Sequence, residues 1–287
     1  MQYIQEACLV NLVTNALFTQ KEHKIFEFTW DRIENHKQIF SLDYNHEDAQ
    51  SLLQLCLMVT ESNYLNKSLN PPSLIQKFDL LYDECPLPLI SQISTKSPLN
   101  QSAKVGHIFY NNISNVLSII FTGTINGCMA GLDLAYGQTE LEGVLNYIIG
   151  LKGHRGIYLA YQSIRSQLVE VVKSHLPKNP QIIISGHSLG GALSQICALD
   201  LAYYNPIHYS FAAPMVFNEV GYNVFTKLVK YSYRIANISD LVVLSPLPVM
   251  PNRDAFFHVG KLIHFQSNLG EYRLNHALAY VQEYNLG

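Results

Sequence analysis

The stretch Gln181-Ile-Ile-Ile-Ser-Gly-His-Ser-Leu-Gly-Gly191 decides the fold of this chain. A short run of β-branched residues meets the pentapeptide Gly-His-Ser-Leu-Gly, and a helical pattern follows over 192–204. A glycine-flanked serine between a strand and a helix is typical of a nucleophile elbow, which lifts the serine hydroxyl above the sheet. Glycine is needed at 186 and 190 because a side chain there would collide with the neighbouring strand or helix. We expect Ser188 to be a nucleophile in a strained turn, with the Leu189 N–H directed at a developing oxyanion.

Strand-like and helical patterns alternate on both sides of this elbow. Apolar residues spaced for one helix face predict helices at 46–62 and 157–175. Runs rich in β-branched and aromatic residues predict strands at 107–110, 116–121, 181–185, 207–211, 231–235 and 255–265. Segment 66–104 is interpreted as loops around one short helix near 74–83. The alternation predicts an α/β fold with a mostly parallel central sheet and helices on both faces.

Length and charge limit the classes of protein. The chain has 287 residues, with 19 Lys and Arg against 22 Asp and Glu, a balance that argues against a nucleic-acid partner. The length suits one large domain or two small ones. We predict one domain over 45–287 and an N-terminal extension over 1–44 that packs on its core.

Cysteine spacing and hydropathy indicate whether the chain has a metal site, a membrane span or a signal peptide. The five cysteines form no CxxC pair, so we expect free buried thiols and no metal site. No cofactor is expected either. No window reaches about 18 uninterrupted apolar residues, so no transmembrane segment is predicted. The N-terminus lacks the basic start of a signal peptide. Both a cytoplasmic location and export without a visible cleavable signal fit this sequence.

A serine nucleophile needs a general base and a carboxylate that orients it. Asp240 follows a predicted strand, at the end where ligands bind in open α/β sheets, and is the expected acid. Asp254 remains the alternative acid. Asp200 lies within the helix after the elbow and is expected to be structural.

The expected base is His276, which follows a loop at 268–274 and opens a helical segment at 277–284. A histidine carried by a loop can reach across the top of the sheet, whereas His258 lies in a strand-like run and is the alternative. A second oxyanion donor is expected in Thr122-Gly123-Thr124, directly after the predicted strand 116–121. The backbone N–H of Thr124 is the candidate.

Several motifs in sequence order resemble one family. The Phe-Thr-Gly-Thr segment at 121–124 resembles its F-R-G-T/S oxyanion segment, and Gly-His-Ser-Leu-Gly-Gly at 186–191 is identical to its GHSLGG. Further matches occur at 153–157, 209–214, 233–248, 257–260 and 276–280. The chain therefore resembles the fungal-type (class 3) lipases, which have the α/β-hydrolase fold. The resemblance is firmest over 105–280 and looser over 46–104.

The resemblance implies that Ser188, Asp240 and His276 form a catalytic triad, with Leu189 and Thr124 as the oxyanion hole. It implies hydrolysis of acylglycerols or phospholipid acyl esters without a metal. The sequence departs from the family at Thr122, where an Arg is usual, and at two further positions, Leu241 for Pro and Ala212 for Gly. None of the three is a triad position, so activity is still expected.

The region after the oxyanion segment is rich in glycine and apolar residues. We interpret 125–143 as a lid that covers the site and opens during transient contact with a lipid surface. Two other functions remain open on the sequence alone. One is an esterase or acyltransferase for small soluble esters, and the other is a catalytically idle lipid-binding protein.

Overall fold

The computed structural model describes residues 40–64, 75–82, 103–123, 137–145, 148–246 and 255–286. Its central sheet has seven strands in the order β1-β2-β3-β6-β7-β8-β9. The strands are β1 (Ile75–Tyr82), β2 (Ala103–Asn111), β3 (Val116–Phe121), β6 (Gln181–His187), β7 (Ile207–Phe211), β8 (Tyr231–Asn237) and β9 (Lys261–Phe265). Neighbours from β3 to β9 pair in parallel, while β1 and β2 are antiparallel. The predicted mostly parallel sheet is confirmed.

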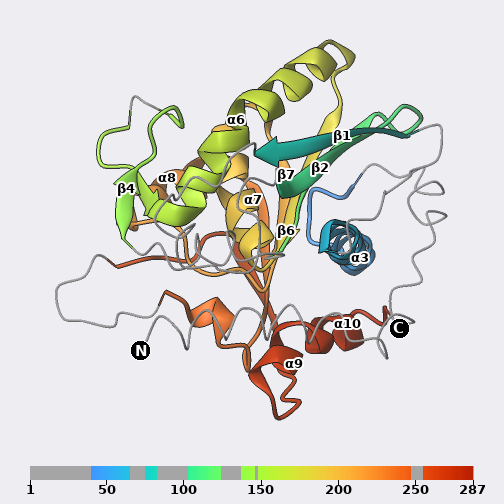
Figure 1. Ribbon diagram of the computed structural model, residues 1–287, viewed down its shortest axis with the longest axis vertical. Coiled ribbons are helices and arrows are strands. Elements are labelled where there is room, and N and C mark those ends of the chain that lie inside the picture. The colour runs from blue at the N-terminus through green and yellow to red at the C-terminus, as the bar shows by residue number, and fades with distance from the viewer. Residues whose placement is uncertain are drawn as a thin grey trace.

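Helices cover both faces of this sheet (Figure 1). One face carries α6 (Arg155–His175), α7 (Leu189–Asp200) and α8 (Glu219–Leu228), whose apolar side chains join one buried cluster with the sheet. The other face carries α3 (His46–Tyr64) and α10 (Leu278–Glu283), which join a second cluster. The short helix α9 (Tyr272–His276) precedes α10, and β4 (Gln138–Glu140) pairs with β5 (Lys152–His154) outside the main sheet.

The helix α6 illustrates how sequence spacing determines packing. Ile157, Tyr161, Ile164 and Leu168 recur at helical spacing and are all buried. The helix begins where the Nδ1 atom of His154 accepts a hydrogen bond from the Ile157 N–H, as an N-cap does. By contrast α7 is buried along nearly its whole length, because it lies between α6 and the sheet.

One predicted helix is a strand. Residues near 74–83 form β1, which pairs with β2 along its whole length. Ile75, Phe78 and Leu81 are spaced as on one face of a helix. The segment is a strand because it pairs with β2, and a local stretch of sequence does not show that partner. His107 Nδ1 on β2 lies 2.8 Å from Asp79 Oδ1, so the carboxylate of Asp79 has a hydrogen-bond partner within the sheet.

Other boundaries also differ from the sequence prediction, and three of them lie near the elbow or the C-terminal segment. The predicted strand 255–265 pairs with β8 only from Lys261, after Gly260 takes a positive φ of 84°. The helix after the elbow begins at Leu189 and ends at Asp200, and a separate 3-10 turn follows at Ala202–Tyr204. His276 is the last residue of α9 and does not open the C-terminal helix, because the backbone breaks at Ala277.

The described end of the predicted N-terminal extension contacts the core. The backbone N–H and carbonyl of Phe40 both bond the side-chain amide of Gln181 at the start of β6. The hydroxyl of Tyr44 lies 3.1 Å from that of Tyr284. Residues 1–39 lie outside the described residues, so the domain boundary at 44 stays a prediction.

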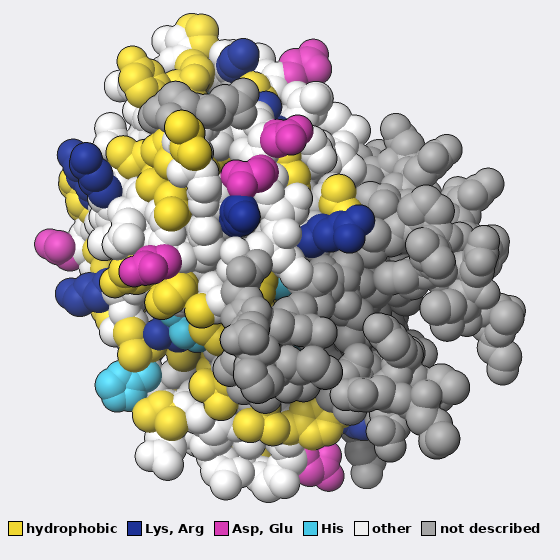
Figure 2. All heavy atoms as spheres, turned by 90° about the vertical axis from the view of Figure 1, so that its left-hand side faces the viewer, with side chains coloured by type: hydrophobic (Ala, Val, Ile, Leu, Met, Phe, Trp, Pro, Cys, Tyr) yellow, Lys and Arg dark blue, Asp and Glu magenta, His cyan; other side chains and the backbone are white. Residues whose placement is uncertain are grey.

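Composition-based predictions can be compared with the described part of the chain. Within it, no helix has the length and apolarity that a bilayer crossing requires. Cys56 and Cys197 are buried free thiols, while Cys8, Cys85 and Cys128 lie outside the described residues. Figure 2 shows one face on which acidic and basic side chains are interspersed among apolar ones.

Candidate active site

Ser188 occupies a sharp turn between β6 and α7. Its φ of 59° and ψ of −125° are a strained backbone conformation for a residue with a side chain. A Cβ atom on Gly186 would lie 2.2 Å from backbone atoms of Gly190, and one on Gly190 would lie 2.5 Å from the Phe121 carbonyl oxygen. Without a shift of the backbone, neither position has room for a Cβ atom, so both require glycine, as the sequence predicts.

The structure brings three predicted residues together above the sheet. The Nε2 atom of His276 lies 2.8 Å from Ser188 Oγ, and its Nδ1 atom lies 2.8 Å from Asp240 Oδ2. Asp240 is 0% exposed and His276 is 1% exposed. A carboxylate only accepts hydrogen bonds, so Nδ1 carries the proton and Nε2 accepts from the serine hydroxyl. This is the arrangement by which an imidazole removes a proton from a nucleophile.

Two further donors hold the carboxylate of Asp240. The Val242 N–H donates to Oδ1 at 2.9 Å, and the Tyr280 hydroxyl donates to Oδ2 at 3.1 Å. The same hydroxyl accepts from the Asn237 N–H at 2.9 Å. Burial, together with the charge of Asp240, raises the pKa of Tyr280 well above its usual value. Tyr280 therefore stays protonated and acts as a donor to the carboxylate.

His187, the residue before the serine, supports the backbone of the base. Its Nε2 atom lies 3.0 Å from the carbonyl oxygen of His276, and the two rings are 5.0 Å apart. Burial, followed by the nearby His276, lowers the pKa of His187 to about 3. The ring is neutral at pH 7, and because a carbonyl only accepts, Nε2 carries its proton.

Of the two alternatives, His258 is not part of this arrangement. It lies before β9, and its buried Nδ1 atom has no hydrogen-bond partner among the described residues. Asp254 lies outside the described residues. Asp200 accepts two bonds from Arg165, at 2.7 and 2.9 Å, and a third from Tyr161. Its predicted structural role is confirmed, since it joins α6 to the end of α7.

The two expected oxyanion donors differ in what the structure describes. Leu189 is the first residue of α7, where backbone N–H groups have no acceptor within the helix. Thr124 lies outside the described residues, but the preceding Gly123 reaches the elbow. A Cβ on Gly123 would be 3.4 Å from the His187 carbonyl oxygen. The Gly123 N–H donates a hydrogen bond to Thr60 Oγ1 at 3.0 Å. The oxyanion segment thus enters beside Ser188.

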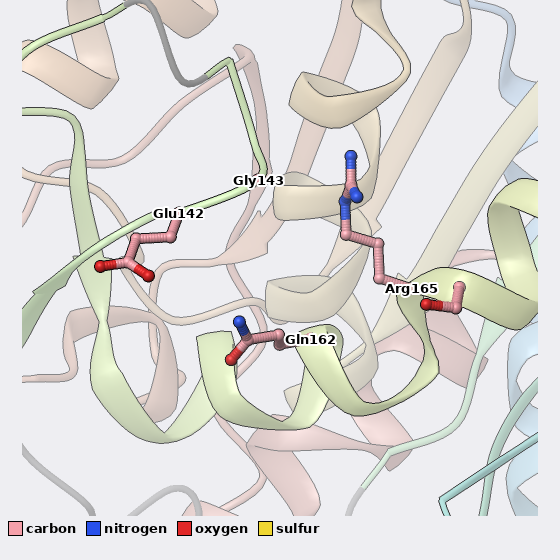
Figure 3. Close-up of a pocket in the computed structure, with 5 residues that line it drawn as sticks. Glu142, Gly143, Gln162 and Arg165 are labelled. Atoms are coloured by element: carbon pink, nitrogen blue, oxygen red, sulfur yellow. The ribbon is translucent and has the colours of Figure 1, made fainter.

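Residues 125–136 of the predicted lid lie outside the described residues, and the remainder includes β4. The turn after β4 borders a pocket of about 620 Å³ against α6. Figure 3 shows Gln162 and Arg165 of α6 lining this pocket opposite Glu142. The pocket is polar and contains no triad residue, so it is separate from the candidate active site.

Sequence reasoning missed the residues that support the triad, namely His187, Asn237 and Tyr280. His187 occupies a variable position of the G-x-S-x-G pattern, which gives it no function. Tyr280 lies four residues after His276, and Asn237 is a polar residue ending an apolar strand three residues before Asp240. The signal available in the sequence is a polar residue within a few positions of a predicted triad member, and its burial becomes visible only in the structure.

Comparisons with known proteins identify similar sequences. Residues 118–250 match the model of the family described as Lipase (class 3). A lipase of Rhizopus niveus is 26% identical over 35% of this chain and 25% of that protein. A secreted alkaline triacylglycerol lipase of Penicillium cyclopium is 30% identical over 35% of this chain and 36% of that protein. The resemblance to class 3 lipases is confirmed, although the chain spans only about a quarter to a third of these relatives.

Solved structures address the fold. The Rhizomucor miehei lipase in its native propeptide complex superimposes with a TM-score of 0.57 at 17% identity. The match covers 76% of this chain and 67% of that chain. This protein has the α/β-hydrolase fold.

Proposed function

We propose that this relative of the fungal-type class 3 lipases hydrolyses carboxylic esters of lipids through an acyl-enzyme on Ser188. The observation that carries the proposal is the unbroken chain from Ser188 Oγ through His276 to Asp240, with both distances at 2.8 Å. The relatives, a lipase and a triacylglycerol lipase, support lipid esters as the substrates.

The mechanism has two steps. His276 Nε2 takes the proton of Ser188 as its oxygen attacks the ester carbonyl, and Asp240 stabilises the imidazolium that forms. The Leu189 and Thr124 N–H groups stabilise the oxyanion of the tetrahedral intermediate. The protonated His276 then gives its proton to the leaving alcohol. Water attacks the acyl-enzyme by the same route, releasing the carboxylic acid and restoring Ser188.

We extend the proposal to transient contact with a lipid surface. Three aliphatic side chains beside Asp240 are exposed: Ile238 at 56%, Leu241 at 63% and Leu244 at 47%. Apolar side chains gathered at the rim of a site favour contact with an apolar phase. The secreted Penicillium relative supports export as the location, one of the two that the sequence allows.

The first experiment is labelling with a fluorophosphonate, which reacts with an activated serine, combined with hydrolysis of tributyrin and of a phospholipid. We expect wild-type protein to be labelled and to hydrolyse at least one of these esters. The Ser188→Ala variant should fold normally and lose both properties.

The structure offers a matched control in a second serine–histidine pair. Ser194 Oγ lies 2.9 Å from His208 Nε2, but the other ring nitrogen of His208 contacts Ser232 and no carboxylate. Ser194 is also fully buried. Ser194→Ala should therefore keep its labelling. A wild-type protein that takes no label, or a Ser188→Ala variant that does, would contradict the proposed nucleophile.

A further inference from the structure

Asn237 ends β8 as a fully buried polar side chain. Its Nδ2 atom donates to the carbonyls of Ser267 at 2.8 Å and Asn275 at 2.9 Å. Its Oδ1 atom accepts from the N–H groups of Ser239 at 3.1 Å and Ser267 at 3.0 Å. A primary amide has two N–H donors and one oxygen with two lone pairs, so its hydrogen-bonding capacity is completely used.

The partners of this amide belong to two separate parts of the chain. Ser239 directly precedes Asp240, whereas Asn275 directly precedes His276 and Ser267 lies in the loop that leads to α9. One side chain thus connects the turn that carries the acid to the segment that carries the base. Its backbone N–H also bonds the Tyr280 hydroxyl, which itself donates to Asp240.

Other contacts between these two parts are also polar. The acid turn carries exposed residues on both sides of Asp240, and β9 at the edge of the sheet is largely exposed. Further links among the described residues run from the Ile238 N–H to the Phe265 carbonyl at 2.9 Å and from Asn275 Nδ2 to the Ser239 carbonyl at 3.2 Å. The separation of acid and base therefore depends on polar bonds, in which Asn237 is the central partner.

We propose that Asn237 is a positioning residue that sets the geometry between Asp240 and His276. It acts through their neighbours and touches no reacting atom. The proposal rests on the proposed function, because it assumes that these two residues work as a catalytic acid–base pair. It predicts that removing the amide donor separates the pair while the fold persists.

The decisive comparison is Asn237→Asp against Asn218→Asp. Both changes keep the side-chain shape and the accepting oxygen but replace the N–H₂ donor. Asn218 caps α8: its Oδ1 accepts from Gly221 and Lys152, and its Nδ2 donates to Gly150. It is thus a second asparagine that joins two chain segments, without contact to the triad.

Two readouts distinguish positioning from a general structural effect. The first is the low-field proton NMR signal of the His276 Nδ1–H, recorded in a Ser188→Ala background. We expect Asn237→Asp to lose or shift this signal, and Asn218→Asp to keep it. The second is steady-state kinetics, where Asn237→Asp should lower kcat about 10²-fold, as expected for a misplaced catalytic group, with KM little changed. Asn218→Asp should stay within about twofold of wild type.

Asn237→Asp introduces a charge beside two carbonyls, so Asn237→Ser, which is neutral, is measured in parallel and decides the outcome if the first variant does not fold. A folded Asn237 variant with an unchanged signal and unchanged kcat overturns the proposal, as does an Asn218→Asp variant with the same losses. If wild-type protein hydrolyses no ester, the proposed function fails, but the NMR comparison still tests the positioning by Asn237.

Discussion

The elbow glycine Gly190 allows a quantitative test of how the nucleophile is positioned. In Gly190→Ala the new Cβ would lie 2.5 Å from the Phe121 carbonyl oxygen and 2.6 Å from that of Thr122. Both neighbours are backbone atoms, so no side chain can rotate away. Reaching an ordinary contact of 3.4 Å requires the start of α7 and the end of β3 to separate by about 0.9 Å.

This separation has two calculable consequences. Overpacking of a tight contact typically costs about 1–3 kcal/mol, which lowers the free energy of unfolding by that amount. Ser188 and Leu189 belong to the displaced turn, whereas His276 is carried by another segment. A misplacement of about 1 Å at a reacting centre costs on the order of 10²-fold in rate, so kcat/KM should fall by about that factor.

The assay combines urea unfolding with tributyrin kinetics, and Gly221→Ala serves as the control. A Cβ on Gly221 would lie 2.8 Å from the Phe217 Cβ, a similar overpacking between α8 and the residue two positions before it. The control should lose a comparable stability and keep kcat/KM within about twofold. A folded Gly190→Ala variant with wild-type kinetics would refute the argument that this close approach positions the serine.

Two further predictions concern buried polar groups. Tyr280→Phe removes the hydroxyl that donates to Asp240 and accepts from the Asn237 N–H. We expect the free energy of unfolding in urea to fall by about 1–3 kcal/mol and kcat to fall about tenfold. Unchanged values for both would contradict this role of the hydroxyl. Stability should also fall as the pH drops from about 6.5 towards 4. Burial lowers the pKa values of several described histidines below the unfolded value, so the unfolded chain binds more protons in this range, and each contributes up to about 1.4 kcal/mol per pH unit. Those with the largest shifts are His154 and His258, each with a pKa of about 4, and His187 and His208, each with about 3. Urea midpoints at pH 7, 6 and 5 test this, and a flat profile would count against it.

The elbow and the mostly parallel sheet were predictable because their signals are local. Gly186, Ser188 and Gly190 lie between a strand-like run and a helical pattern, which is the context of a nucleophile elbow. Asp240 follows the end of a predicted parallel strand, and His276 follows a loop that can reach the same edge of the sheet. Even so, the pattern did not show that His276 closes α9, since no glycine or proline marks the break at Ala277.

The missed features depend on contacts between distant residues. The strand β1 forms because β2 pairs with it and His107 partners Asp79, and neither partner is visible in a window around residue 78. Likewise Asn237 resembles an ordinary polar residue at a strand end, because its partners lie 30 and 38 positions away. Local patterns predict elements, whereas tertiary hydrogen bonds determine which polar residues support a site.

The position of β9 has a consequence for where the molecule opens first. This strand borders the sheet, pairs on one side with β8, and is largely exposed, while β6 at the centre is buried along almost its whole length. Segments with few buried contacts exchange their amide hydrogens through local opening that costs less than global unfolding. The loop after β9 leads to His276. Transient opening of β9 therefore moves His276 away from Ser188 while the elbow between β6 and α7 stays folded. Loss of catalysis on mild heating would thus reflect a reversible local event and precede the melting of the core.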